Sequence, residues 1–261
     1  MSGEVLVGER GHVRTLTLHR PDVRNAMSSA MLRQLCTELL AAEDDPDVRV
    51  VILTGTDPAF TAGLDLVEVG RSGLDNFLTD DPKASPWAIL HGMDTPVVAA
   101  VNGACVTGGL ELLVQCSFAV ASDRARFADT HARVGLHPGG GMLVLLPQAV
   151  GMRRAREMTF TGRFVDAYEA ERIGLVNRVV PHDELLAHCG VVAAEIASCD
   201  RRTVAALNRS YRDIAEGTLG DGHALEVRRA LEWKAEPADI EARRAAVIAR
   251  GRHEPDAPKT T

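Results

Sequence analysis

Two histidines, His131 and His137, lie in the segment DTHARVGLHPGGG, just before a proline and three consecutive glycines. Such a segment is compatible with a metal site, a phosphate-binding loop, a catalytic acid or a turn, and each of these needs different residues elsewhere in the chain. A spacing of six residues does not place two ligands on one face of a helix, so this pair is a poor arrangement for a metal ion. His137, which precedes Pro138, is typical of a loop residue. The remaining interpretations depend on the rest of the sequence.

Two glycine-containing turns could present free backbone N–H groups to a ligand. In GTDPAFTAGLDL, Gly63 follows a strand that ends at Thr54 and indicates an unusual backbone angle, at a place where open α/β sheets bind ligands. In VNGACVTGGLELL, Gly108 and Gly109 open a predicted helix, and the free N–H groups of a helix start favour a negative oxygen. Glu111 lies in the first turn of that helix. This pattern is neither GxGxxG nor a P-loop, so it does not indicate nucleotide binding.

Each of these features has an ordinary structural explanation when it is taken alone. The segment around Gly63 could be a plain turn, and a carboxylate such as that of Glu111 stabilises the start of a helix through the helix dipole. Taken together, the amide after Gly63 and the amide of Gly108 could form an oxyanion hole for a polarised carbonyl, with Glu111 within one helical turn of it.

The elements that must hold these turns are predicted to alternate between strands and helices. A strand is predicted for VRTLTL, whose residues alternate, and it ends before Pro21. A helix is predicted for SSAMLRQLCTELLAAEDD, where helical spacing of apolar residues follows the serine caps. The apolar run VRVVILTG is predicted to be a buried strand. The stretch at 95–122 repeats the order of apolar strand, glycine turn, helix and apolar stretch. This alternation predicts α/β layering.

Composition restricts the class of protein. The 261 residues suit one large α/β domain with a helical appendage, and the sequence turns Ala-, Arg- and Glu-rich with helical patterns from about residue 196 onward. A net charge of −7 argues against nucleic acid or an anionic membrane as the main partner. The N-terminal segment lacks the order of a signal peptide and no apolar run is long enough to span a bilayer, so we expect a cytoplasmic protein. Five cysteines without CxxC spacing indicate buried reduced thiols: Cys36, Cys105, Cys116, Cys189 and Cys199.

Five segments, in this order and spacing, resemble the crotonase or enoyl-CoA hydratase/isomerase superfamily over about residues 5–190. They are HRPDVRNAM, AFTAGLDL, PVVAAVNGACVTGGLEL, ARFADTHARVGLHPGGG and TGRFVDAYEAERIGLVNRVVP. The resemblance implies an α/β fold, a crotonase-like spiral of β-β-α turns with a C-terminal helical region. It divides the chain into an acyl-CoA-binding core at 1–195 and a helical trimerisation or lid region at 196–261. It also implies a homotrimer or hexamer, to which the apolar tail positions could contribute: Leu225, Leu231, Trp233, Val247 and Ile248.

The resemblance assigns roles to particular residues. It implies that the backbone N–H groups of Leu64 and Gly108 form the oxyanion hole for a thioester oxygen. Contacts with coenzyme A are implied for a second set: Arg24, Ala62 and Asp65.

The catalytic positions depart from the family pattern at one place. Family hydratases hold the attacking water with two glutamates, and Glu111 matches the first of them. The second position is occupied by His131. An imidazole titrates near neutral pH, so it can bind water or give a proton to the substrate α-carbon, and a Glu–His pair is adequate for acid–base chemistry.

The resemblance therefore implies an enoyl-CoA hydratase-type lyase that adds water across the 2,3 double bond of an acyl-CoA thioester. Glu111 is expected to activate water for attack at C3, and His131 to orient the water and take part in protonating C2. No metal and no cofactor are expected beyond the coenzyme A of the substrate. The alternatives are another crotonase-type reaction, such as double-bond isomerisation or thioester hydrolysis, and a non-catalytic acyl-CoA binder, because the second glutamate is replaced.

Overall fold

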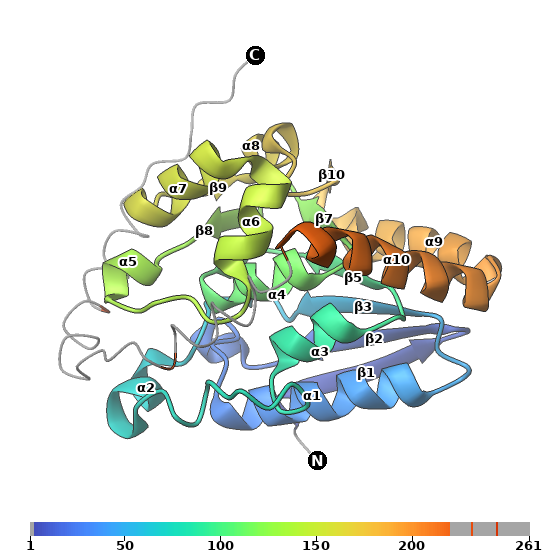
Figure 1. Ribbon diagram of the computed structural model, residues 1–261, viewed down its shortest axis with the longest axis horizontal. Helices are drawn as coiled ribbons and strands as arrows, with labels where there is room; N and C mark the ends of the chain where they lie inside the picture. Colours follow the sequence, from blue (N-terminus) through green and yellow to red (C-terminus); the bar gives the residue numbers. More distant parts are fainter. Residues whose placement is uncertain (1–2, 220–230, 232–243, 245–261) are drawn as a thin grey trace.

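The computed structural model describes residues 3–219 together with residues 231 and 244, and its strands form two sheets (Figure 1). The larger sheet has the spatial order β1 (Val5–Arg10), β2 (Val13–Leu18), β3 (Val50–Gly55), β5 (Val97–Val101), β7 (Phe118–Ser122) and β10 (Arg178–Val180). The smaller sheet has the order β4 (Ala59–Thr61), β6 (Ala104–Val106), β8 (Arg126–Ala128) and β9 (Val165–Asp166). Only the β1–β2 and β8–β9 pairs are antiparallel among the described strands.

The helices connect and cover these sheets (Figure 1). They are α1 (Ser29–Asp44), α2 (Leu66–Ser72), α3 (Pro86–Gly92), α4 (Gly108–Gln115), α5 (His131–Val134), α6 (Met142–Val150), α7 (Met152–Thr161), α8 (Ala167–Ile173), α9 (Leu185–Ser198) and α10 (Arg201–Leu219). The chain places one strand in the larger sheet and the next in the smaller sheet before it enters a helix, as in β5–β6–α4 and β7–β8–α5. This repetition is the expected spiral of β-β-α turns.

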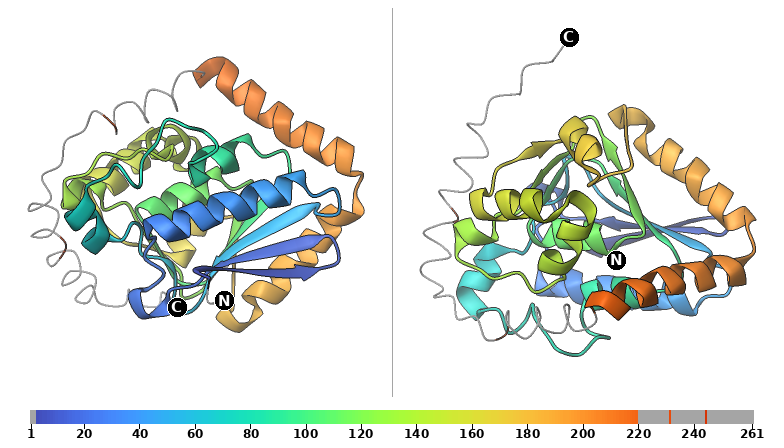
Figure 2. Two further views of the ribbon diagram at one scale, coloured as in Figure 1. Left: turned by 90° about the horizontal axis from the view of Figure 1, so that it is seen from below. Right: turned by 45° about the horizontal axis from the view of Figure 1, so that its top comes forward.

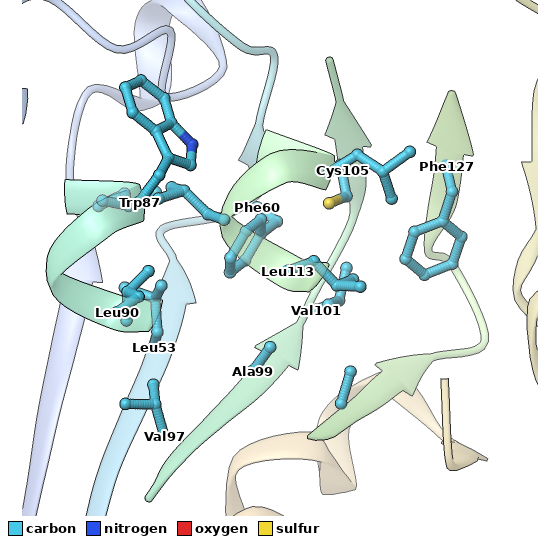
Figure 3. Packing of buried hydrophobic residues seen from close by; sticks show 14 of the residues in the cluster. Leu53, Phe60, Trp87, Leu90, Val97, Ala99, Val101, Cys105, Leu113 and Phe127 are labelled. Atoms are coloured by element: carbon cyan, nitrogen blue, oxygen red, sulfur yellow. The ribbon is translucent and has the colours of Figure 1, made fainter. Parts of the chain in front are cut away.

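The central strands of the larger sheet are covered on both faces. Every residue of β3 and β5 is buried, which explains why these parallel strands read as continuous apolar runs. Leu53 and Ala99 belong to the main core, and Figure 3 shows them with Leu90 of α3. Their neighbours Ile52 and Ala100 face the other way and pack in a second cluster with helix α9. Successive residues of a strand thus serve two separate cores.

The predicted local elements are confirmed. Strand β2 buries alternate residues, and helix α1 begins after Ser28, whose hydroxyl accepts a hydrogen bond from the Met31 amide. Strand β6 was not predicted, because its three residues lie inside the small-residue turn before Gly108. Of the cysteines, Cys199 is exposed and Cys116 half-buried, so the prediction that all five are buried is wrong for these two.

Two helices occupy the described part of the C-terminal region, and the first of them begins before the predicted boundary. Helix α9 runs across the expected boundary at residue 195 and ends at Ser198. Helix α10 follows after a short turn in which the chain reverses its direction (Figure 2). Asp94, just after α3, accepts hydrogen bonds from Arg209 and Arg212 of α10. No helix within the described residues is long and apolar enough to cross a membrane. Of the tail positions named above, Leu225, Trp233, Val247 and Ile248 lie outside the described residues.

Candidate active site

The two predicted glycine turns meet just after the paired strands β4 and β6 of the smaller sheet. Gly63 has a φ of 90°, and a Cβ atom there would lie 2.9 Å from the Val106 carbonyl oxygen and 3.5 Å from the Gly108 nitrogen. Only glycine combines this backbone angle with so close an approach. The prediction of an unusual angle at Gly63 is therefore confirmed, and it brings the AGLD turn against the start of α4.

The Leu64 amide is oriented by its neighbours. The Gly63 carbonyl accepts a hydrogen bond from the Met27 amide at 2.8 Å, and the Asp65 amide donates to the Met27 carbonyl at 2.9 Å. Because peptide groups alternate in direction in such a bridge, the N–H of Leu64 points away from Met27. Neither this amide nor that of Gly108 donates a hydrogen bond to another described residue.

The start of α4 is fixed around Gly108. Thr107, which precedes the helix, has a φ of 53°, and its amide donates to the Ala128 carbonyl at 2.9 Å. The indole N–H of Trp87 donates to the Gly108 carbonyl at 3.2 Å. The Gly108 amide is the first N–H group of the helix, and it carries the positive end of the helix dipole. Two backbone N–H groups that are able to bind an oxyanion thus come from adjacent loops.

Glu111 is buried, with 4% of its surface exposed. Its Oε1 accepts hydrogen bonds from the backbone N–H groups of Gly139 at 3.1 Å and Gly140 at 2.8 Å. The three-glycine segment, for which a metal site and a phosphate-binding loop were considered, therefore binds the Glu111 carboxylate. A Cβ atom on Gly140 would lie 2.7 Å from the Trp87 ring and 3.0 Å from the Glu111 Cβ, so this approach requires glycine.

His131 opens helix α5 and completes the site. Its Nε2 atom lies 3.9 Å from Glu111 Oε2, and its side chain is 7% exposed. Its Nδ1 atom lies 2.7 Å from Oδ1 of Asp129, which also accepts the backbone N–H of His131 at 3.1 Å. The Thr107 and Thr130 hydroxyls, 2.5 Å apart, join this segment to the start of α4. The two predicted catalytic side chains are thus brought together.

The three ionisable groups perturb one another. Burial raises the pKa of Glu111, although the charge of a protonated His131 and the N–H groups of Gly140 and Gly139 oppose the shift. Burial also acts to raise the pKa of Asp129, but the positive charge and the hydrogen bonds of His131 outweigh it and hold that pKa below its usual value. Glu111 is consequently a stronger base than an exposed glutamate, which suits general-base catalysis.

The predicted coenzyme A residues divide into two groups. The Ala62 amide donates to the Arg24 carbonyl at 3.0 Å, which places the exposed Arg24 beside the AGLD turn. Asp65, in contrast, caps α2 by accepting from the Val67 and Glu68 amides and forms an ion pair with Arg20 at 3.0 Å. Both Asp65 oxygens are thus engaged within the protein, and this geometry supports a role in holding the turn rather than a substrate contact.

The roles of Asp129, Gly139 and Gly140 were not predicted from the sequence. Asp129 stands two residues before a candidate catalytic histidine, and that local spacing is a signal that could have identified it. The glycine contacts with Glu111 had no comparable local signal because they join residues 28 and 29 positions apart. Asn25 was not predicted as a structural residue either. It is fully buried, and its side-chain amide donates a hydrogen bond to the Ala59 carbonyl at 2.7 Å, which holds the turn after β2 in place.

A second group with hydrolase-like composition lies elsewhere. Ser122 Oγ is 3.0 Å from His182 Nδ1, and His182 Nε2 is 3.1 Å from Asp57 Oδ2. Ser122 is completely buried, so it cannot reach a substrate, and these contacts join β7, the segment after β10 and the turn after β3. No cluster of metal-ligating side chains occurs within the part of the chain that the structure describes.

Two neighbouring backbone amides thus lie beside a buried Glu–His pair on a spiral of two sheets, an arrangement suited to stabilising an oxyanion and to acid–base chemistry. The chain belongs to the enoyl-CoA hydratase/isomerase family, whose model matches residues 8–240. The resemblance inferred from the five sequence segments is thereby confirmed.

Individual relatives cover most of the chain. It is 36% identical over 233 residues to a Mycobacterium bovis protein named as a probable enoyl-CoA hydratase, covering 87% of this chain and 89% of that protein. The crystal structure of an enoyl-CoA hydratase from Mycobacterium tuberculosis is similar at 45% identity and a TM-score of 0.79, covering 88% of this chain and 97% of that chain. A monofunctional enoyl-CoA isomerase from Mycobacterium smegmatis is similar at 36% identity and a TM-score of 0.72, covering 85% and 99%.

Proposed function

We propose that the chain is an enoyl-CoA hydratase that uses Glu111 and His131 to add water across the 2,3 double bond of an acyl-CoA thioester. The observation that carries the proposal is the arrangement of Glu111. One of its oxygens is held by two backbone N–H groups, and the other faces His131 Nε2 at 3.9 Å. An oxygen about 2.8 Å from each of these atoms fits between them, so both can contact one water molecule.

The amides of Leu64 and Gly108 supply the electrostatic part of the mechanism. The thioester oxygen binds between them, and charge develops on that oxygen when a nucleophile attacks C3. Because the amides are already oriented, they stabilise the enolate without reorganisation, and such a donor is worth roughly 10²–10³-fold in rate.

The acid–base steps then balance as follows. Glu111 accepts a proton from water as the water oxygen bonds to C3, and the electrons of the double bond move to form the enolate. Protonated His131 gives its Nε2 proton to C2 as the thioester carbonyl re-forms. The proton on Glu111 returns to His131, so the net change is the addition of one water molecule.

Coenzyme A binding is proposed for the outer part of the site. Arg24 is exposed beside Ala62, and a cation there suits the phosphates of coenzyme A on a chain whose net charge is −7. The main chain near Ala62 is the proposed contact for the adenine. We retain a homotrimer or hexamer in the cytoplasm as a proposal, together with a reaction that needs no metal and no cofactor beyond substrate coenzyme A. Sedimentation that gives a monomer at micromolar concentration would contradict the assembly.

A panel of thioesters incubated with the protein in deuterated water and followed by mass spectrometry tests the function. The panel holds 2-enoyl-CoA, 3-enoyl-CoA and 3-hydroxyacyl-CoA of several chain lengths. A hydratase converts the first into a product that is heavier by one water with one deuterium at C2, and dehydrates the third. Interconversion of 2- and 3-enoyl-CoA alone would indicate an isomerase, loss of coenzyme A a hydrolase, and no change a non-catalytic binder. Each of these last three results contradicts the proposal.

A further inference from the structure

Asp129 occupies the loop between β8 and α5 and is completely buried. Its Oδ1 accepts two hydrogen bonds from one residue, the ring Nδ1 of His131 at 2.7 Å and the backbone N–H of His131 at 3.1 Å. An ionised carboxylate can only accept, so the ring nitrogen that faces it carries the proton. The carboxylate therefore selects the Nδ1–H tautomer and directs Nε2 towards Glu111.

The environment of Asp129 makes His131 its main partner. The Oδ2 atom of Asp129 is buried and has no hydrogen-bond partner among the described residues. A buried carboxylate with so few partners is costly unless a positive charge lies beside it. Glu111 on α4 also faces the imidazole, and Thr159 on α7 makes a smaller contribution to lowering the pKa of Asp129. His131 thus has a carboxylate on each side of its ring, that of Asp129 at Nδ1 and that of Glu111 towards Nε2.

We infer that Asp129 is a positioning residue of the proposed hydratase: it fixes the tautomer of His131, keeps Nε2 directed at Glu111, and supplies the negative charge that favours the imidazolium. The inference rests on the proposed function. It also accounts for the charge of the site. The family pattern of two glutamates that share one proton has a net charge of −1. Ionised Glu111 and ionised Asp129 on either side of a protonated His131 have the same net charge. An imidazolium held on a buried aspartate therefore replaces a second carboxylic acid as the proton donor to C2.

Asp129→Asn tests the inference in the full-length protein. The variant keeps an oxygen that can accept from His131 but removes the charge, so we expect kcat to fall about 10²-fold or more while KM changes less than about threefold. Because activity needs protonated His131, the alkaline limb of the pH profile should move to lower pH by about one unit. Asp166→Asn is the matched control, since Asp166 caps α8 by accepting from the Glu169 amide away from the site, and its kcat and pH profile should stay unchanged.

A tautomer measurement on the wild-type protein keeps the inference testable if Asp129→Asn does not fold. In protein labelled with ¹⁵N-histidine, with the signals assigned by His131→Gln, Nδ1 of His131 should remain protonated above the pH at which the ring becomes neutral. A neutral ring protonated at Nε2 would overturn the inference, as would an Asp129→Asn enzyme with unchanged kcat and an unchanged alkaline limb. If the wild-type protein hydrates no thioester, the proposed function fails, and the tautomer measurement still decides the role of Asp129.

Discussion

The Oε2 atom of Glu111 lies 3.9 Å from the Nε2 atom of His131, although the two residues come from different β-β-α turns of the spiral. This separation is too long for a direct hydrogen bond and short enough for one oxygen to contact both atoms. A carboxylate and an imidazole in this relation can both contact one water molecule, as the proposed hydration requires.

Glu111→Gln should remove activity without harming the fold. A glutamine Oε1 can still accept from Gly139 and Gly140, and the variant no longer buries an ionisable group. Because burial raises the pKa of Glu111 in the folded state, ionisation of this residue makes the protein less stable as the pH rises above its unfolded pKa.

We therefore expect Glu111→Gln to have a Tm at pH 7 equal to or higher than that of the wild type, with a smaller difference near pH 4. Thermal unfolding at the two pH values measures this difference. If the Tm of Glu111→Gln minus that of the wild type is lower at pH 7 than at pH 4, the predicted direction of the pH dependence is wrong.

Gly140→Ala should disturb Glu111 through packing. The added methyl group would lie 2.7 Å from the Trp87 ring and 3.0 Å from the Glu111 Cβ, so the loop must move and its N–H group leaves the carboxylate. Overpacking of this kind costs about 1–3 kcal/mol, and we expect kcat to fall at least about tenfold. Urea unfolding and steady-state kinetics measure the two effects.

Gly190→Ala is the matched control for this substitution. Gly190 lies in α9, where a Cβ atom would meet no other atom within 4 Å. Alanine favours a helix over glycine by up to about 1 kcal/mol, so this variant should be as stable as the wild type or more stable, with unchanged kcat. Equal behaviour of the two variants would show that the contacts of Gly140 have no role in the site.

His131→Glu should be more harmful alone than together with Asp129→Asn. The single variant places a third carboxylate beside Asp129 and Glu111 and removes the cation between them, which costs about 3–5 kcal/mol for a broken buried pair. The second substitution removes one of the three charges, so the double variant should recover most of the lost free energy of unfolding. Additive effects in urea unfolding would indicate that the residues at 129 and 131 are not coupled.

Loss of the Asp94 carboxylate charge should weaken the contact between helix α10 and the segment after α3. The hydrogen bonds and charges of Arg209 and Arg212 hold the pKa of Asp94 below its usual value, so this contact stabilises the protein above the unfolded pKa and is lost as the pH falls through the lower folded one. We expect Asp94→Asn to speed amide hydrogen exchange in α10 at pH 7, where the wild type retains the contact.

The matched control for Asp94→Asn is Arg153→Ala, an exposed position on α7. It should leave exchange in α10 unchanged. Slow exchange in α10 of Asp94→Asn at pH 7 would mean that other contacts hold this helix.

Local periodicity predicted part of the framework that holds the site. Strand β2 and helix α1 follow the period of their apolar residues, and Gly63 and Gly108 marked the two turns that meet. Strand β6 escaped because three small residues carry no periodic signal. The contacts of Glu111 with the glycine loop depend on how one turn of the spiral packs on the next, which no local pattern specifies. Asp129 was predictable in principle, but only once His131 was known to need a partner.

The most direct test of the central claim is the transfer of oxygen from labelled water to C3 of a 2-enoyl-CoA. The protein is incubated in H₂¹⁸O with the thioester, and the product is fragmented to locate the label. We predict a 3-hydroxyacyl-CoA with ¹⁸O at C3 from the wild-type protein, and a rate at least about 10³-fold lower from Glu111→Gln. Label at C3 formed equally fast by both proteins, or no label at C3 in the wild-type product at any chain length, would contradict the account.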